Sequence, residues 1–198
     1  MPASRYDKAY FDTWYRDSKN RVSTPALISK KAHLAVAVGE YYLGRQVRTV
    51  LDIGCGEGQW FQALKTLRPR LRYTGVDPSP YVIQRFGKRR NVISGSFGDL
   101  PKLSPSYDLL ICSDCLYYVP DNELIVGLEI LAHHLAGVAF LEAYPAEEEV
   151  EGDTSTIYPR TAAHYRKIFK RAGFLSCGSH CYVGPALREL VTELEKGL

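Results

Sequence analysis

The chain has 198 residues, a length that suits one domain with a full hydrophobic core and requires no second domain. Hydrophobic residues make up 45% of it and the formal net charge is +3, a balance typical of an ordinary globular protein rather than one that coats nucleic acid. The opening residues are polar and no run of about 18 uncharged apolar residues occurs, so we expect a cytoplasmic protein without a membrane anchor.

The N-terminal segment, residues 1–24, carries aromatic residues among charged ones, at a spacing that predicts one short amphipathic helix. These aromatic residues are Tyr6, Tyr10, Phe11, Trp14 and Tyr15. Such a helix either packs on the domain or covers a substrate pocket, and in the second case we expect Tyr10 and Trp14 to contact the substrate. The segment is therefore a candidate lid.

A second helix is predicted from Pro25 to Leu43, because Pro25 suits a first helical turn and Gly44 suits a helix end. The apolar run that follows, with Val50 and Ile53 at its ends, predicts a strand buried on both faces of a parallel sheet.

Gly54, Gly56 and Gly58 alternate along the turn after this strand. Glycine allows positive φ and, lacking Cβ, lets a ligand lie directly against the backbone. Residues 59–67 then show helical spacing, so the turn leads into a helix N-terminus with free N–H groups. Asp52 lies among the apolar residues of the strand, and a buried carboxylate needs donors or a cationic partner.

The pattern D-x-G-x-G-x-G from Asp52 to Gly58 resembles the first motif of class I S-adenosylmethionine-dependent methyltransferases. The resemblance implies a Rossmann-like α/β three-layer sandwich with a mostly parallel central sheet and helices on both faces. It also implies that Asp52 and the backbone of the glycine turn, including Cys55, bind the methionine portion of S-adenosylmethionine, whose product is S-adenosylhomocysteine. The alternative is an Asp at the sheet edge that bonds to its own turn.

A second strand, predicted over residues 72–76, ends in Asp77, about 20 residues beyond the glycines, where nucleotide-binding folds return an acid to the ribose hydroxyls. In the resemblance this is the second motif, and Asp77 would bind both ribose hydroxyls with Pro78 beside it. An ordinary turn Asp before proline is the alternative.

A helix over residues 79–86 is followed by basic residues 88–90, which we expect to be a solvated helix end. A third strand over residues 92–95 leads into GSFGDLP. Members of the resembled family often carry an acid directly after the glycine to bind the adenine amino group, but this chain has Ser96. The Ser96 hydroxyl, the Phe97 backbone N–H and the Asp99 side chain are all candidates for the adenine contact.

A fourth strand over residues 107–112 continues into SDCLYYVPDNEL, which resembles the fourth motif of small-molecule methyltransferases. Ligands bind at the carboxyl edge of an open parallel sheet, so Ser113, Asp114, Tyr117 and Tyr118 should face the transfer site. Ser113 would then contact the cofactor and the two tyrosines the substrate, unless the tyrosines only pack the wall.

A fifth strand over residues 137–141 ends near Tyr144, a further candidate substrate contact. If methyl transfer uses a general base, the candidates are Asp114, Tyr117, Glu142 and His164. The acidic residues at 147–149, 151 and 153 are expected to form a solvated loop. A helix over residues 161–172, a tight hairpin within residues 174–183 and a terminal helix over residues 184–198 complete the chain.

The motifs predict one domain, with a lid at residues 1–24, a core at residues 25–183 and the terminal helix, and a methyltransferase that acts on an oxygen or nitrogen of a small-molecule acceptor. A methyltransferase acting on RNA or protein is the first alternative. An NAD(P)-dependent oxidoreductase is disfavoured because the third glycine comes one residue early for G-x-G-x-x-G.

Two further interpretations of the sequence are a regulator and a zinc site. A cofactor-binding regulator is a third alternative, because fold does not fix function. Zinc bound by residues 112, 115, 177, 180 and 181 would need segments from separate strands to converge, so we expect no metal. The oligomeric state, monomer or dimer, is left open.

Overall fold

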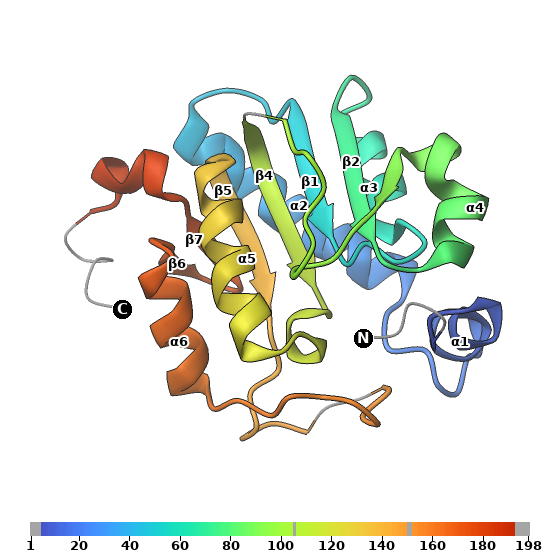
Figure 1. Cartoon of the computed structure of the whole chain (residues 1–198). Helices are drawn as coiled ribbons and strands as arrows, with labels where there is room; N and C mark the ends of the chain where they lie inside the picture. Colours follow the sequence, from blue (N-terminus) through green and yellow to red (C-terminus); the bar gives the residue numbers. More distant parts are fainter. Residues whose placement is uncertain (1–4, 105, 150–151, 193–198) are drawn as a thin grey trace.

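The computed structural model describes residues 5–104, 106–149 and 152–192. Within them the strands form one sheet in the order β3-β2-β1-β4-β5-β7-β6 (Figure 1). Neighbouring strands from β3 to β5 run parallel, whereas β7 runs antiparallel to both β5 and β6. The predicted Rossmann-like sandwich with a mostly parallel sheet is confirmed.

The strands that shape the site are β1 (Thr49–Ile53), β2 (Arg72–Asp77), β3 (Val92–Ser94), β4 (Tyr107–Ser113) and β5 (Leu135–Glu142). The chain moves outward from β1 to β2 and β3, then returns to place β4 on the other side of β1. This reversal between β1 and β4 is the point at which open α/β sheets bind ligands, at the carboxyl ends of the strands. The predicted terminal hairpin is also present, as β6 (Leu175–Gly178) and β7 (Cys181–Val183).

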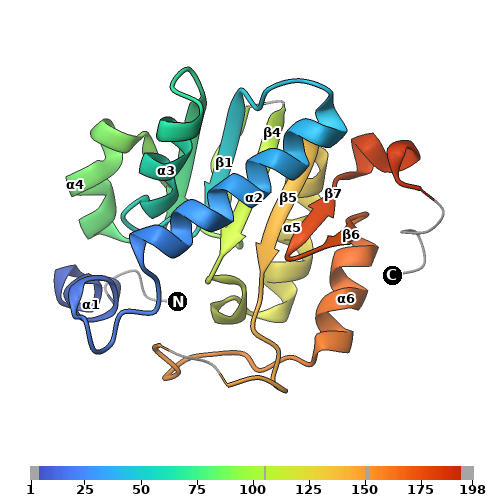
Figure 2. The same cartoon turned by 180° about the vertical axis from the view of Figure 1, so that it is seen from behind.

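Helices cover both faces of the sheet because successive strand residues point to opposite faces and both sets are apolar. Val50 packs with α2 (Pro25–Leu43) and α3 (Gln59–Leu67) on one face. Leu51 packs with α5 (Asp121–His133) and α6 (Ala162–Arg171) on the other. Figure 2 shows α2 running diagonally across the sheet, with α5 behind it.

The N-terminal segment forms α1 (Lys8–Phe11) and one π-helical turn (Asp12–Arg16). It lies beside the carboxyl edge of the sheet, near α4 (Pro80–Arg90) (Figure 1). Phe11 packs into a third apolar cluster with Val82 and Phe86 of α4. The predicted short helix is therefore confirmed, with a π turn at its end.

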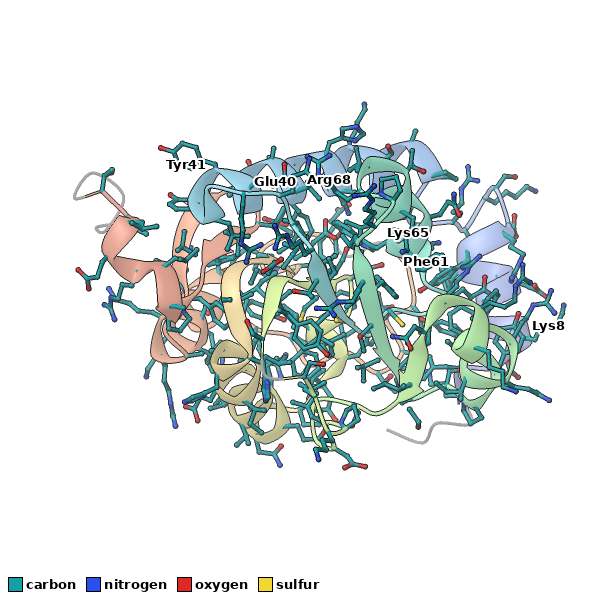
Figure 3. All side chains as sticks on the ribbon, turned by 90° about the horizontal axis from the view of Figure 1, so that it is seen from above. Lys8, Glu40, Tyr41, Phe61, Lys65 and Arg68 are labelled. Atoms are coloured by element: carbon teal, nitrogen blue, oxygen red, sulfur yellow. The ribbon has the colours of Figure 1, made fainter. Side chains whose placement is uncertain are left out.

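At the opposite edge of the sheet, where β1 begins, Glu40 near the end of α2 forms an ion pair with Arg68, which follows α3. Figure 3 views this edge from above and shows the two side chains together. Glu40 also accepts a hydrogen bond from the Val47 N–H at 3.0 Å. This bond fixes the segment that leads into β1, at the end of the sheet away from the carboxyl edge.

Three sequence expectations need correction. The helix predicted to end at Phe86 runs to Arg90, whose guanidinium donates to the Glu57 carbonyl and lies 4.5 Å from the Phe86 ring, so this basic end is only partly solvated. In place of a terminal α-helix, Pro185–Leu190 form a 3-10 helix, and Val191 turns extended to bury its side chain. The remaining terminal residues, Leu194 among them, lie outside the described part of the chain.

The acidic loop is the third correction. The expectation holds for residues 147–149, which are exposed, but Asp153 is half-buried and pairs with Arg5. Glu151 lies outside the described residues. Among the residues described, no helix is both long enough and apolar enough to cross a membrane.

Candidate active site

The glycine turn forms a backbone cradle between β1 and α3. Gly54, Gly56 and Gly58 all have positive φ, between +52° and +76°, which an L side chain rarely adopts. A Cβ at Gly54 would lie 2.7 Å from the Cβ of Cys115, so the space beside the turn is also closed to a side chain. Gly58 then serves as the N-cap of α3.

Asp52, on β1, is 1% exposed and accepts a hydrogen bond from the Tyr73 hydroxyl at 2.6 Å. Burial raises the pKa of this carboxyl to about 7, although the Tyr73 hydrogen bond acts in the opposite direction. The carboxylate thus accepts a hydrogen bond from Tyr73, and a cationic partner would stabilise its ionised form.

Asp77, at the end of β2, joins the glycine turn to α4. Its carboxylate accepts the Gly56 N–H at 2.8 Å and the Ser79 N–H at 2.9 Å. Burial raises the pKa of Asp77 to about 6, and both backbone hydrogen bonds lower it. The two backbone hydrogen bonds fix the orientation of the Asp77 carboxylate before any ligand binds.

Two cavities open at the carboxyl edge. The larger, of about 180 Å³, extends from the glycine turn past Asp77 to the start of α5, and the smaller, of about 30 Å³, lies beside Asp52. Three residues line both: Tyr15, Gly54 and Asp114. The two cavities are therefore neighbours, with the Tyr15 ring and the end of β4 at their junction.

Asp114 follows β4 in a left-handed conformation with φ of 60°, which Asp tolerates better than most residues. The Tyr117 hydroxyl donates to its carboxylate at 2.5 Å. Burial raises the pKa of Asp114 to about 6; the Tyr117 hydrogen bond lowers it and the nearby Glu142 raises it. At neutral pH this carboxylate is mostly ionised.

Glu142, at the end of β5, is held by two donors. Lys31 of α2 binds it at 2.6 Å, and the Ser113 hydroxyl donates to it at 2.6 Å. Ser113 lines the smaller cavity, whereas Glu142 lines neither. The carboxylate is neutralised in place and positions its two partners.

The N-terminal segment is fastened over this edge at three points. Arg16 binds both carboxylate oxygens of Glu57, at 2.6 and 2.8 Å. The Ser79 hydroxyl donates to a backbone carbonyl of the segment, and Arg5 pairs with Asp153. The segment is thereby held to the glycine turn, to the start of α4 and to the loop that follows β5.

Most of the predicted site residues line the two cavities. Those in the larger cavity are Tyr10, Gly54, Gly56, Asp77, Pro78, Ser96, Phe97, Asp114 and Tyr118. Those in the smaller cavity are Trp14, Asp52, Gly54, Cys55, Ser113 and Asp114.

Four predicted substrate or catalytic residues line neither cavity: Tyr117, Glu142, Tyr144 and His164. Tyr117 is buried behind Asp114, and the Tyr144 ring packs edge-on against it at 5.7 Å. His164 is on α6, with its Nε2 3.7 Å from Asp121. The structure thus places His164 with α5 rather than with the carboxyl edge of β1.

Sequence reasoning missed several lining residues, of which Tyr15 and Glu123 matter most to the site. Tyr15 belonged to the aromatic cluster, but its contact with Gly56 depends on where the whole segment folds back. Glu123 stands in the first turn of α5, at the sheet edge where ligands bind, and that position was a usable signal. Among the described residues, no three Cys, His, Asp or Glu side chains converge as a metal site.

The sequence model of a methyltransferase domain family matches residues 24–190. This chain belongs to the S-adenosylmethionine-dependent methyltransferases. A trans-aconitate 2-methyltransferase of Deinococcus radiodurans is 29% identical to this methyltransferase over 84 residues, which are 42% of this chain and 33% of the relative. The aligned segment therefore spans about a third of that relative's length.

Solved structures share the fold. CalS10 of Micromonospora echinaspora, an amino pentose methyltransferase with S-adenosylmethionine bound, has a TM-score of 0.62 at 16% identity over 83% of this chain and 92% of its own. ChlM of Synechocystis PCC 6803, a magnesium protoporphyrin IX methyltransferase with bound S-adenosylhomocysteine, has a TM-score of 0.57 at 17% identity over 92% of this chain and 95% of its own.

The cofactor of this methyltransferase is S-adenosylmethionine, and the residues present fit it. Because Gly54 and Gly56 lack a Cβ, other groups can lie directly against the turn, as the Cys115 and Tyr15 side chains do. Asp52 and Asp77 are buried carboxylates with raised pKa values, which a positively charged ligand and hydroxyl donors would satisfy. These two acids and the glycine backbone are the groups that would hold the cofactor.

Proposed function

We propose that this methyltransferase transfers a methyl group from S-adenosylmethionine to an oxygen or nitrogen of a small-molecule acceptor. The observation that carries the proposal is the fastened N-terminal segment, which contributes walls to both cavities through Trp14, Tyr15 and the aromatic residues before them. A cover held in this way encloses the site, which favours a small-molecule acceptor over a folded RNA or a protein surface.

The charges of the lining support the same acceptor class. Among the described residues that line the two cavities, the acids are Asp52, Asp77, Asp114 and Glu123, and none is Lys, Arg or His. Proteins that bind nucleic acid neutralise phosphates with Lys and Arg, so an RNA strand would find no partner here.

In the proposed arrangement Asp52, beside the smaller cavity, would hold the methionine portion of the cofactor. Asp77, beside the larger cavity, would hold its ribose. The cavities share Tyr15, Gly54 and Asp114, so the transfer site would be at this junction.

When bound, S-adenosylmethionine supplies an electrophilic methyl group on a positively charged sulfur. The protein contributes by aligning the acceptor and excluding water, and alignment alone is worth up to about 7–11 kcal/mol in favourable cases. We assign Asp114 to orient the acceptor N–H or O–H and to take its proton, because it lies at the junction and its pKa is about 6. Burial raises the pKa of Tyr117, which stays protonated and donates to Asp114.

We assign the other candidates to supporting positions. Tyr10 and Tyr118 form the acceptor wall, because both line the larger cavity. Tyr144 supports Tyr117 from behind. Glu142 holds Ser113, since its carboxylate is already satisfied, and His164 receives no role in transfer.

The glycine turn is poorly suited to the pyrophosphate of NAD(P), which disfavours the oxidoreductase alternative. A dinucleotide pyrophosphate needs the backbone N–H groups of the glycine turn. The Gly56 N–H already donates to Asp77, and Asp52 adds negative charge next to the turn.

The test is an assay of S-adenosylhomocysteine release with three fractions of a cell extract: the low-molecular-weight filtrate, the RNA and the protein. We expect release with the filtrate. Release with RNA or protein alone would contradict the acceptor class. Asp114→Asn should lower kcat while leaving S-adenosylhomocysteine affinity unchanged. Glu129→Gln is the matched control, because Glu129 is a half-buried acid on α5 that pairs with Arg171 and lines neither cavity.

The proposal keeps the single domain with its lid at residues 1–24 and the cytoplasmic location as predictions. Size-exclusion chromatography with light scattering would decide between monomer and dimer. An essential second copy would contradict the arrangement above, in which one chain supplies the whole site.

A further inference from the structure

The end of the larger cavity toward the start of α5 has apolar walls. Its walls there come from four side chains: Pro78, Phe97, Val119 and Pro120. Flat apolar walls beside a ribose-binding acid suit a stacked base. Glu123, in the first turn of α5, brings a carboxylate to the same end.

Two glycines bring Glu123 to this position. A Cβ at Gly127 would lie 2.7 Å from the Phe97 ring and 2.9 Å from the Phe97 carbonyl, so α5 packs directly on the backbone after β3. Glu123 is four residues earlier and therefore on the same face of the helix. An ideal Cβ at Gly98 would be 2.5 Å from its Oε2, so the carboxylate lies in the space that a side chain at position 98 would fill.

In the neighbouring turn, Ser96 also lines the larger cavity, but its polar groups are hydrogen-bonded within the turn. The Ser96 hydroxyl accepts the Asp99 N–H at 3.2 Å, and the Ser96 N–H donates to the Asp99 carbonyl at 3.1 Å. Asp99 is exposed and lines a neighbouring hollow, which Glu123 also borders, but unlike Glu123 it does not line the larger cavity. Among the described residues, no donor pairs with the half-buried Glu123 carboxylate, which faces the end of the larger cavity.

We propose that Glu123 is the residue that recognises the base of the cofactor, by accepting a hydrogen bond from the exocyclic amine of adenine. The inference rests on the binding of S-adenosylmethionine and adds the residue that reads its base. An ionised carboxylate only accepts hydrogen bonds, so a purine with a carbonyl in place of the amine would set two acceptors against each other. Gly98 and Gly127 provide the space that this contact requires.

The test compares S-adenosylhomocysteine with S-inosylhomocysteine, which carries a carbonyl in place of that amine, by calorimetric titration. The wild-type protein should prefer S-adenosylhomocysteine by at least about tenfold, because a buried unpaired acceptor costs at least 1–3 kcal/mol. Glu123→Gln should reduce the preference to about threefold or less and improve S-inosylhomocysteine binding, because an amide both accepts and donates. If Glu123 had only a structural role, Glu123→Gln would not improve the binding of S-inosylhomocysteine.

Gly98→Ala is a second variant that leaves Glu123 itself intact. Its added methyl displaces the carboxylate and should also reduce the preference, whereas Ser96→Ala and Asp99→Asn should keep it. An unchanged preference in Glu123→Gln, or its loss in Asp99→Asn, would overturn the assignment while leaving the methyl donor in place. Binding of neither nucleoside to the wild-type protein would overturn the donor itself, and Glu123 with it.

Discussion

Replacing Asp77 with Ala tests the cofactor site at one carboxylate. Asp77 is 6% exposed and accepts two backbone N–H groups, from Gly56 and Ser79, so its direction is fixed before any ligand arrives. A hydrogen bond to a charged group contributes about 1.5–3 kcal/mol. Asp77→Ala should therefore weaken S-adenosylhomocysteine binding by roughly tenfold to a hundredfold.

Isothermal titration of both proteins with S-adenosylhomocysteine at neutral pH measures this loss. Asp99→Ala is the matched control, because Asp99 is an exposed acid after the next strand and does not line the larger cavity. Its affinity should stay within about twofold of the wild type. Thermal melting without ligand shows whether Asp77→Ala still folds. A folded Asp77→Ala protein with wild-type affinity would refute the assignment of the ribose to Asp77.

Two further predictions concern the glycine turn and its acids. Burial raises the pKa of Asp52 to about 7 and of Asp77 to about 6, and a cationic cofactor with hydroxyl donors favours the ionised carboxylates. Binding of S-adenosylmethionine between these two pH values should release protons and strengthen as pH rises; calorimetric heats that do not change with the ionisation enthalpy of the buffer would contradict this. Gly54→Ala should lower both the melting temperature and the affinity for S-adenosylhomocysteine, because a Cβ there meets the Cys115 side chain and φ is positive. Gly44→Ala, with a similar φ and open space around it, should lower only the melting temperature. Equal affinities in the two glycine variants would show that the turn does not hold the ligand.

The raised carboxyl pKa values also fix the sign of the pH dependence of stability. Asp52 and Asp77 bind protons more tightly in the folded chain than in the unfolded one, because their folded pKa values exceed the ordinary value. Their contribution is therefore most favourable below the ordinary carboxyl pKa and is lost as pH rises through the folded values. Cofactor binding offsets this loss.

The parts of the fold that the sequence predicts well are encoded locally. The apolar run at β1, the glycines after it and the helical spacing of α3 lie within 20 residues of one another, and the structure has them at the expected positions. Asp77 was found by its interval from the glycines, because the length of a helix and a strand fixes where the chain returns to the edge.

The parts that escaped prediction depend on contacts between distant segments. Ser96 and Asp99 drew attention because they follow β3 directly, whereas Glu123 reaches the same cavity from α5 through close packing at Gly127. Tyr15 reaches the glycine turn only because the N-terminal segment folds back and is fastened there. The spacing of residues within one segment cannot predict these contacts between distant segments.

The terminal helix failed for a different reason. Its apolar residues fit a helical period, but Leu190 is 58% exposed and Val191 is buried after the chain has turned extended. Burial of the Val191 side chain in the apolar cluster on one face of the sheet therefore decides the conformation here, and the helical spacing does not.

A calorimetric titration of the wild-type protein with S-adenosylhomocysteine and, separately, with NADH tests the central claim most directly. The account predicts that S-adenosylhomocysteine binds with one site per chain and that NADH gives no binding heat. Binding of NADH without binding of S-adenosylhomocysteine would contradict it.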